Sequence, residues 1–238
     1  MRIGLFSDIH ANWQALEAVL EDCDDVIDDG LCLGDVVGYG GDPVRCVDEV
    51  RKRGWPTLVG NHDRACTDPQ ILDWFNEDAA FVIKWTMSEL GQKRLAWLSE
   101  LPESDEREGV LLVHGSPRDP IFEYILDGAT ALANLNLLGK RACFHGHTHL
   151  PGCFYMNGDQ VEHDYHLGRV RVFGPALINP GSVGQPRDGN PDASYAIWDT
   201  DQEILEWRRV PYDREGAQKA ILDAGLPERF AVRLAVGG

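Results

Sequence analysis

Positive charge is scarce in this chain. The 238 residues include 22 lysines and arginines against 39 aspartates and glutamates, which gives a formal net charge of −17 at pH 7. Because a sequence-independent grip on nucleic acid needs stripes of basic side chains, non-specific nucleic-acid binding is not expected. An anionic substrate remains compatible with this charge, since bound divalent cations reverse it locally.

Closely spaced cysteines and long apolar runs are also lacking. The 6 cysteines form no CxxC pair, so we expect reduced, mostly buried thiols and not a disulfide-stapled secreted domain. No apolar run approaches the roughly 20 residues that span a bilayer. The chain reaches Asp8 too early for the apolar region of a signal peptide. These absences predict a cytoplasmic protein without a membrane segment.

The composition is otherwise typical of a globular protein. Hydrophobic residues make up 43% of the chain and charged residues 26%, and the length allows a sizeable core. The sequence contains no linker, internal repeat or low-complexity segment. We therefore expect residues 1–238 to form a single domain.

The first sixty residues alternate between strand and helix patterns. Short apolar runs at 3–7, 30–33 and 57–59 predict buried strands. Residues 12–23 show helical spacing, and Asp42-Pro43 is expected to begin a helix that Gly54 ends. This β-α-β-α-β order predicts an α/β protein with a largely parallel sheet.

The middle of the chain favours more helix. Residues 70–101 are expected to form two helices that divide near Gly91, and the buried face of the first is predicted to contain Phe81, Val82, Trp85 and Leu90. A strand at 110–113, a helix at 130–138 and a strand at 142–144 follow.

After residue 150 the pattern changes to short strands and turns. Asn157-Gly158 predicts a hairpin, and further strands are expected at 170–173, 176–178, 194–198 and 204–210. We expect these antiparallel strands to form a second sheet packed on the first. A last helix is predicted at about 214–224.

Side chains that can bind metal follow one predicted strand after another. In chain order they are Asp8 and His10, then Asp35, then Asn61 and His62, then His114, and then His145, His147 and His149. In open α/β sheets, ligands bind just beyond the carboxyl ends of the strands. One such residue alone is more often a helix cap or turn residue, but caps do not explain histidines at successive strand ends. These oxygen and nitrogen donors exceed the needs of one tetrahedral ion and suit two divalent ions.

The pattern resembles a known family. The matching blocks are Asp8-Ile9-His10, Gly34-Asp35, Gly60-Asn61-His62-Asp63, His114 and Gly146-His147-Thr148-His149. In order and spacing they resemble the signature of calcineurin-like metallophosphoesterases, and Asn179-Pro180-Gly181-Ser182 is similar to the small bacterial YfcE-like phosphodiesterases. The resemblance implies a four-layer α/β/β/α sandwich, in which two mixed sheets are flanked by helices.

The resemblance also implies how the ligands divide between two ions. Asp8, His10, Asp35 and His149 would hold one ion, and Asp35, Asn61, His114 and His147 would hold the other. The two oxygens of Asp35 would span ions about 3.5–4 Å apart. Manganese is the expected metal, with iron, zinc, nickel or cobalt as alternatives, and His145 is expected to make a structural hydrogen bond.

The implied chemistry is phosphoester hydrolysis by a hydroxide that bridges the ions. His62 would protonate the leaving group as a general acid. Asp63 would either orient that ring or serve only as a turn residue.

The second block departs from that of the serine/threonine protein phosphatases. Those enzymes carry GD-x-x-D-R-G, whereas this chain reads Gly34-Asp35-Val36-Val37-Gly38-Tyr39-Gly40, so the second Asp and a phosphate-binding Arg are missing. Protein-phosphatase activity is therefore not expected. Arg187, in a glycine-flanked loop, and Asn12 are candidate substrate contacts, with a surface arginine and a helix cap as the alternatives.

The most favoured function is hydrolysis of a phosphodiester, because the general acid His62 assists poor leaving groups. A phosphomonoesterase, nucleotidase or dinucleoside polyphosphate hydrolase would use the same site. A third possibility is a non-catalytic scaffold that uses this fold to bind proteins. The known scaffold with this fold lacks the catalytic histidine, whereas His62 is present here, so this possibility is less favoured. The expected partner is a small phosphoester or nucleotide, and a homo-oligomer remains open.

Overall fold

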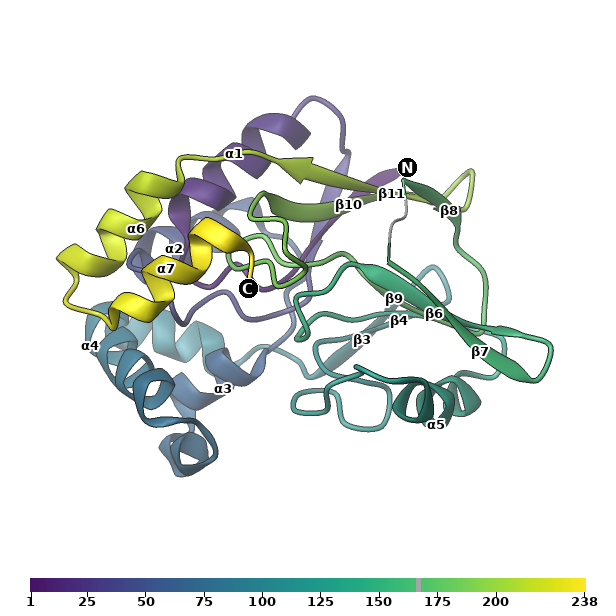
Figure 1. Ribbon diagram of the computed structural model, residues 1–238, viewed down its shortest axis with the longest axis horizontal. Coiled ribbons are helices and arrows are strands. Elements are labelled where there is room, and N and C mark those ends of the chain that lie inside the picture. The colour runs from purple at the N-terminus through teal and green to yellow at the C-terminus, as the bar shows by residue number, and fades with distance from the viewer. Residues whose placement is uncertain (166–167) are drawn as a thin grey trace.

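The computed structural model describes residues 1–165 and 168–238, which form two β-sheets packed face to face (Figure 1). The first sheet contains, in spatial order, β2 (Asp29–Cys32), β1 (Arg2–Phe6), β10 (Ala193–Asp199), β11 (Ile204–Val210) and β8 (Arg169–Arg171). The second contains β3 (Ser104–Arg107), β4 (Val110–Val113), β5 (Ala142–Phe144), β9 (Ala176–Asn179), β6 (Gly152–Asn157) and β7 (Gln160–Asp164).

Both sheets mix parallel and antiparallel pairs. In the first, β1 is parallel to β2 and antiparallel to β10. In the second, β4, β5 and β9 run parallel, whereas β6 is antiparallel to β9. The predicted pair of mixed sheets is thus confirmed.

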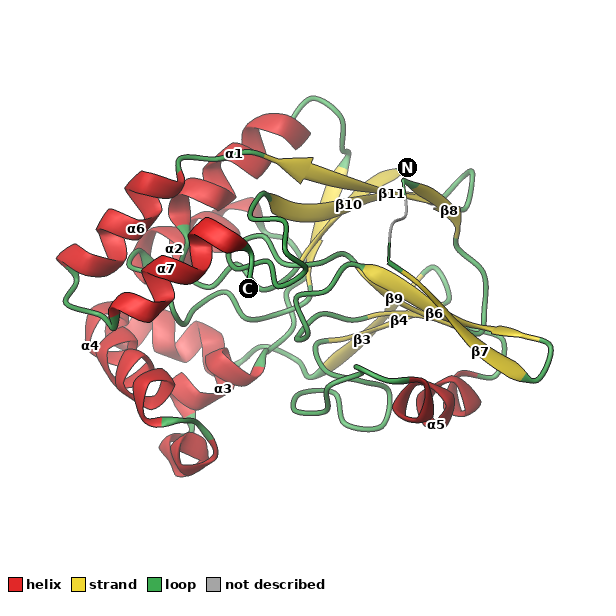
Figure 2. Ribbon diagram, viewed as in Figure 1, coloured by secondary structure: helices red, strands yellow, loops and turns green. Residues whose placement is uncertain are grey.

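Helices cover the outer faces of the two sheets (Figure 2). The first sheet is covered by most of them, and α5 alone packs on the outer face of the second. The helices are α1 (Trp13–Cys23), α2 (Pro43–Arg53), α3 (Asn61–Thr67), the 3₁₀ helix η1 (Pro69–Trp74), α4 (Glu77–Ser99), α5 (Gly128–Leu138), α6 (Arg214–Asp223) and α7 (Glu228–Val236). The order helix, sheet, sheet, helix is the predicted four-layer sandwich.

The period-2 alternation of side chains along strands builds this sandwich. In β5, Ala142 and Phe144 point into the core between the sheets, whereas Cys143 points toward α5. In β9, Ile178 faces the inner core and Leu177 faces α5. Strands buried on both faces therefore read as continuous apolar runs in the sequence.

Several predicted elements are confirmed. Pro43 occupies the first turn of α2, and Gly54 ends that helix in the left-handed conformation with φ of 67°. Gly91 interrupts α4 with non-helical angles, as the predicted division near this residue requires. The β6–β7 hairpin forms around Gly158, since Asn157 pairs with Gln160. All six cysteines are free and buried.

The predicted assignment of strands to sheets is wrong. The strands of the second half do not form a sheet of their own, because β10 and β11 join β1 while β6, β7 and β9 join β4 and β5. Pairing across such long sequence separations depends on which inner faces complement each other, and that information is absent from a local pattern.

Other differences are local. Residues 57–59 form no strand, and Thr57 makes only an isolated bridge to Cys32. Phe81 is 52% exposed, because the buried face of α4 runs through Val82, Ile83 and Leu90. The sequence analysis also missed β3, α3 and α7. No helix among the described residues has the length and apolar character needed to cross a membrane.

Truncation of a leucine in the core between the sheets should destabilise the protein strongly. Leu205 of β11 is fully buried in this core, whereas Leu222 of α6 is 50% exposed. We expect Leu205→Ala to lower the free energy of unfolding by about 2–5 kcal/mol through lost burial and a cavity. The matched variant Leu222→Ala should change it by about 0.5 kcal/mol or less. Urea titration measures both, and equal losses would show that the inner core does not carry this stability.

Candidate metal centre

The loops that follow β1, β2, β4 and β5 meet at one edge of the sandwich. The main chain of Asp8 donates to Gly34 at 3.0 Å and so joins the loops after β1 and β2. Gly146 donates to the carbonyl of His114 at 2.9 Å and joins the loops after β5 and β4. These ties bring side chains from distant parts of the sequence into one buried cluster.

One group of ligand atoms comes from Asp8, His10 and His149. The Nε2 atoms of His10 and His149 lie 3.0 Å apart, and Oδ1 of Asp8 lies 3.3 Å from Nε2 of His149 and 3.8 Å from Nε2 of His10. Three donor atoms that converge in this way can surround a cation.

A second group comes from Asp35, Asn61, His114 and His147. Nε2 of His114 lies 3.5 Å from Oδ2 of Asp35, 3.2 Å from the side-chain oxygen of Asn61 and 3.2 Å from Nδ1 of His147. The structure therefore brings together all seven predicted ligands, and it separates His147 from His149 as the sequence analysis expected.

Asp35 joins the two groups through a single oxygen. Its Oδ2 atom lies 3.6 Å from Nε2 of His10 and 3.5 Å from Nε2 of His114. Its Oδ1 atom instead accepts the main-chain N–H of His62 at 2.8 Å. The sequence analysis expected both oxygens to span the ions, whereas here one oxygen faces both groups because the other holds the start of α3.

Each of the four imidazoles is oriented by the main chain. The outer ring nitrogen donates to a carbonyl in every case: His10 to Val37 (3.1 Å), His114 to Leu33 (2.9 Å), His147 to Phe122 (3.2 Å) and His149 to Gln185 (2.6 Å). Because a carbonyl only accepts, the outer nitrogen must carry a proton, which leaves the inner nitrogen as the atom that can bind a cation. Histidines that bind metals are fixed in this way.

Among the described residues, the cluster contains two buried carboxylates and no lysine or arginine. Asp8 and Asp35 are almost fully buried, and within the described residues neither lies within 4.0 Å of a lysine or arginine. Burial raises the pKa of each carboxyl, but His149 beside Asp8 and His114 beside Asp35 outweigh this and hold both pKa values below the usual range. Oδ1 of Asp8 has no hydrogen-bond partner. Buried anions with a free oxygen fit divalent cations.

The protonation of the histidines supports the same conclusion. Burial lowers the pKa of His10 and His149 and brings that of His147 to about 3, so these rings are neutral and able to donate a lone pair. Burial acts in the same direction on His114, but the charge of Asp35 overrides it and raises the pKa to about 9. A cation bound at this place would displace that proton, as metal binding to histidine generally does.

The backbone around the cluster is strained. Asp8, His10, Asp35, His147 and His149 all adopt left-handed conformations, with φ between 49° and 65°. Residues other than glycine rarely adopt these angles, and they persist where the surroundings impose them, often at functional sites. Gly60 approaches Asp35 closely. A Cβ at position 60 would lie 2.1 Å from Oδ1 of Asp35, so a side chain there would clash with this carboxylate.

His62 lies beside the cluster, on the first turn of α3. Its ring packs 4.5 Å from that of Tyr39 and 5.1 Å from that of Phe75, measured between ring centres, and its buried Nδ1 has no hydrogen-bond partner. A ring nitrogen of His62 also lies within 4.8 Å of ligand atoms of His10 and Asp35. Burial lowers the pKa of His62 to about 4 against the opposing charge of Asp35.

Asp63 serves the backbone. Its carboxylate accepts N–H groups from Val36, Val37 and Gly60 at 3.1–3.3 Å and ties the loop after β2 to the start of α3. Burial and the charge of Asp35 raise its pKa to about 7. The structure thus shows the turn role that the sequence analysis left open. A catalytic role for Asp63 stays a prediction, without a hydrogen bond to His62 among the described contacts.

His145 lies outside the metal-competent groups. It is buried, and its Nδ1 lies 3.4 Å from the side-chain nitrogen of Asn179, the structural contact that the sequence analysis expected. Burial lowers its pKa to about 4.

The two predicted substrate contacts differ in their surroundings. Asn12 caps α1, since its side-chain oxygen accepts from Ala15 at 3.1 Å and its nitrogen donates to Gly184 at 2.8 Å. These bonds match the capping alternative, and a substrate role for Asn12 stays a prediction.

Arg187 lies close to the cluster. Its guanidinium carbon lies 5.8 Å from the ring centre of Tyr39, and the charge of this guanidinium lowers the pKa of His149 and of His62.

Two tyrosines in the site carried little sequence signal. Tyr39 packs 4.6 Å from the ring of His10, and Tyr124 stacks on His147 at 3.6 Å between ring centres. Tyr39 follows Asp35 within the second block, which was a weak indication. Tyr124 follows no strand and fits no motif.

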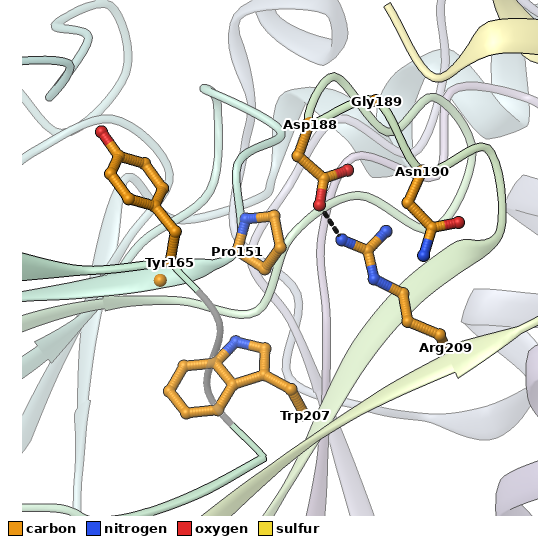
Figure 3. A pocket seen from close by; sticks show the side chains of 8 residues that line it. Pro151, Tyr165, Asp188, Gly189, Asn190, Trp207 and Arg209 are labelled. Atoms are coloured by element: carbon orange, nitrogen blue, oxygen red, sulfur yellow. Dashed lines mark hydrogen bonds and ion pairs between the residues drawn. The ribbon is translucent and has the colours of Figure 1, made fainter.

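The second half of the chain lines a cavity of about 360 Å³ (Figure 3). The side chains of Tyr165, Trp207 and Pro151 face it from one side, and the ion pair of Arg209 with Asp188 closes the other. None of the seven metal-competent residues lines it. This cavity is therefore separate from the candidate metal centre.

Comparison with known proteins gives consistent matches. A model of the calcineurin-like phosphoesterase superfamily domain matches residues 1–203. An uncharacterized protein of Methanocaldococcus jannaschii is 38% identical over 244 residues, which cover 99% of this chain and 98% of the relative.

Solved structures agree with these matches. A metallophosphoesterase from Sphaerobacter thermophilus is 42% identical with a TM-score of 0.89, over 100% of this chain and 99% of that chain. A hypothetical protein from Pyrococcus horikoshii OT3 is 20% identical with a TM-score of 0.82, over 100% of this chain and 98% of that chain, and shares the fold. With its strand-end ligands and its two-sheet sandwich, the chain belongs to the calcineurin-like phosphoesterase superfamily.

Proposed function

We propose that this protein is a dinuclear metal-dependent phosphodiesterase. The observation that carries the proposal is the set of four imidazoles whose outer nitrogens are all bound to main-chain carbonyls and whose inner nitrogens face two buried carboxylates. A structural histidine needs no such orientation, whereas a metal ligand does.

The two ligand groups correspond to two ion positions. Asp8, His10, Asp35 and His149 would hold one ion, and Asp35, Asn61, His114 and His147 the other. Such ions lower the pKa of bound water and neutralise charge on a phosphoryl group. The donor set accepts manganese, iron, zinc, nickel or cobalt, and we propose manganese, with occupancy decided by availability.

His62 is proposed as the general acid. It is the imidazole next to the cluster with a free buried nitrogen, and its main-chain N–H is fixed by Asp35. An anionic phosphoester bound beside the ring would raise its low pKa, because an opposite charge favours the protonated form. The ring would then hold a proton at the position where a leaving group departs.

Arg187 is proposed to bind the phosphoryl group. Its Nη2 atom donates to the side chain of Gln185 at 3.2 Å, and its buried Nε has no partner among the described residues. A guanidinium with free donors beside the cluster suits phosphate oxygens.

Free buried thiols and the absence of a spanning helix in the described part are compatible with the cytoplasmic location that we propose.

A scaffold without catalysis is the less favoured alternative, because all seven ligand positions and His62 are assembled here. A phosphomonoesterase, nucleotidase or dinucleoside polyphosphate hydrolase remains the enzymatic alternative on the same residues.

A hydrolysis panel distinguishes these activities. With Mn²⁺ added, we expect bis(p-nitrophenyl) phosphate to be hydrolysed with a higher kcat/KM than p-nitrophenyl phosphate, as the proposed diesterase function requires. A cyclic nucleotide and a dinucleoside polyphosphate complete the panel. Monoester turnover far above diester turnover would overturn the diesterase assignment, and loss of all turnover with both ions bound would favour the scaffold.

Metal content tests the division of the ligands. After loading with Mn²⁺ and desalting, we expect about two ions per chain in the unchanged protein, about one in His147→Ala and fewer than one in Asp35→Ala, since Asp35 serves both positions. His145→Gln is the matched control from the same segment and should retain both ions. Loss of an ion in this control with a normal thermal transition would show that the histidines are wrongly assigned.

Replacement of His62 tests the general acid. We expect His62→Ala to lower kcat by about 10²–10⁴ on a diester with an alkyl leaving group and by much less on an aryl diester. The reason is that p-nitrophenolate departs without protonation. The metal content should stay unchanged. An equal loss on both esters would mean that His62 acts by another route, such as metal binding.

A further inference from the structure

Almost every arginine of this acidic chain is engaged with a carboxylate. Within the described residues, Arg2, Arg187 and Arg233 are the arginines with no Asp or Glu oxygen within 4.0 Å. With 39 acidic residues available in the sequence, an arginine without a partner is unusual. Two of the three are linked through aromatic rings: Arg187 packs on Tyr39, and Arg233 packs on Phe230, whose ring contacts Tyr39.

Tyr39 is also in contact with His10 and His62. The guanidinium carbon of Arg187 lies 5.8 Å from the Tyr39 ring centre. The ring centre of Phe230 lies 4.9 Å from that of Tyr39. The guanidinium carbon of Arg233 in turn lies 5.9 Å from the ring centre of Phe230. Burial raises the pKa of Tyr39, and the charges of Arg187 and Arg233 both oppose this.

The fold holds the two arginines together through the end of α7. The N–H of Gly189, in the loop that carries Arg187, donates to the carbonyl of Gly237 at 2.8 Å. Figure 1 shows this end of the chain, marked C, near the centre of the view. Leu234, the residue after Arg233, lies at a narrow gap that is also lined by His10 and Tyr39. Helix α7 therefore reaches the metal-competent cluster.

The two arginines act on different groups of the site. The charge of Arg187 acts on His62 and His149, which belong to or adjoin the cluster. The charge of Arg233 acts on Tyr39, and burial and the charge of Arg187 lower the pKa of Arg233. Both side chains are partly buried, and they are linked through the rings of Tyr39 and Phe230. Two such cations without a carboxylate partner favour a bound anion.

We infer that Arg233, together with Tyr39, binds a second phosphate group of the substrate, next to the phosphoryl group that Arg187 binds at the metal-competent cluster. The substrate class is accordingly a phosphodiester whose non-leaving part carries another phosphate. This inference rests on the proposed phosphodiesterase function and adds the specificity of the same site. Arg233 acts as a substrate-binding residue and takes no part in the bond cleavage itself.

A matched pair of substrates tests the inference. Thymidine 5′-(p-nitrophenyl phosphate) and the same ester with an added 3′-phosphate share the scissile bond and the leaving group, and differ in the second phosphate alone. For the Mn²⁺-loaded protein, we expect a kcat/KM about 10-fold or more higher for the ester with two phosphates, mainly through a lower KM. Arg233→Gln should remove most of this preference.

Arg229→Gln is the control from the same helix. Arg229 is paired with Asp78 at 2.7 Å, so its replacement removes a charge from α7 but no unpaired cation, and the preference should persist. The inference is overturned if the unchanged protein shows no preference, if Arg233→Gln keeps it, or if Arg233→Gln slows both esters equally. Failure to hydrolyse either ester would instead reject the proposed function.

Discussion

Two carboxylates, Asp8 and Asp35, are buried at the edge of the sandwich, and among the described residues no lysine or arginine lies within 4.0 Å of either. Such groups are costly to bury unless a cation or a set of donors compensates them. Four imidazoles surround the two carboxylates. A main-chain carbonyl holds the outer nitrogen of each ring, so that the inner nitrogen faces the cluster. The left-handed backbone at the ligand positions is a further consequence, since it turns side chains from different loops toward one point.

Asp35 has a particular place in this arrangement. One oxygen faces ligands of both groups, and the other accepts the main-chain N–H of His62 at the start of α3. The proposed ion positions and the proposed acid are thus coupled through one side chain. A change that moves this carboxylate would disturb binding and proton transfer together, and Asp63, which anchors the backbone on either side, limits such movement.

The distribution of charge follows from the same requirement. In a chain with a net charge of −17, an anionic substrate would be repelled from most of the surface. Among the described residues, most arginines form ion pairs with carboxylates, whereas Arg187 lies over Tyr39 and Arg233 over Phe230 without a carboxylate partner. In the proposed second-phosphate site, α7 contributes a cation in addition to its packing.

The sequence by itself determined the type of fold and predicted the metal-competent residues that the structure brings together. These depend on local patterns: apolar runs that end in Asp, Asn or His, and the blocks that resemble one family. The tertiary structure alone decided which strands share a sheet, because β10 pairs with β1 and β9 with β5 across long sequence separations. It also decided which oxygen of Asp35 faces both groups, which ring nitrogen of each of the four histidines is bound to a carbonyl, and that Arg233 lies over Phe230, whose ring contacts Tyr39. Each of these depends on contacts between residues far apart in the chain, which no local pattern encodes.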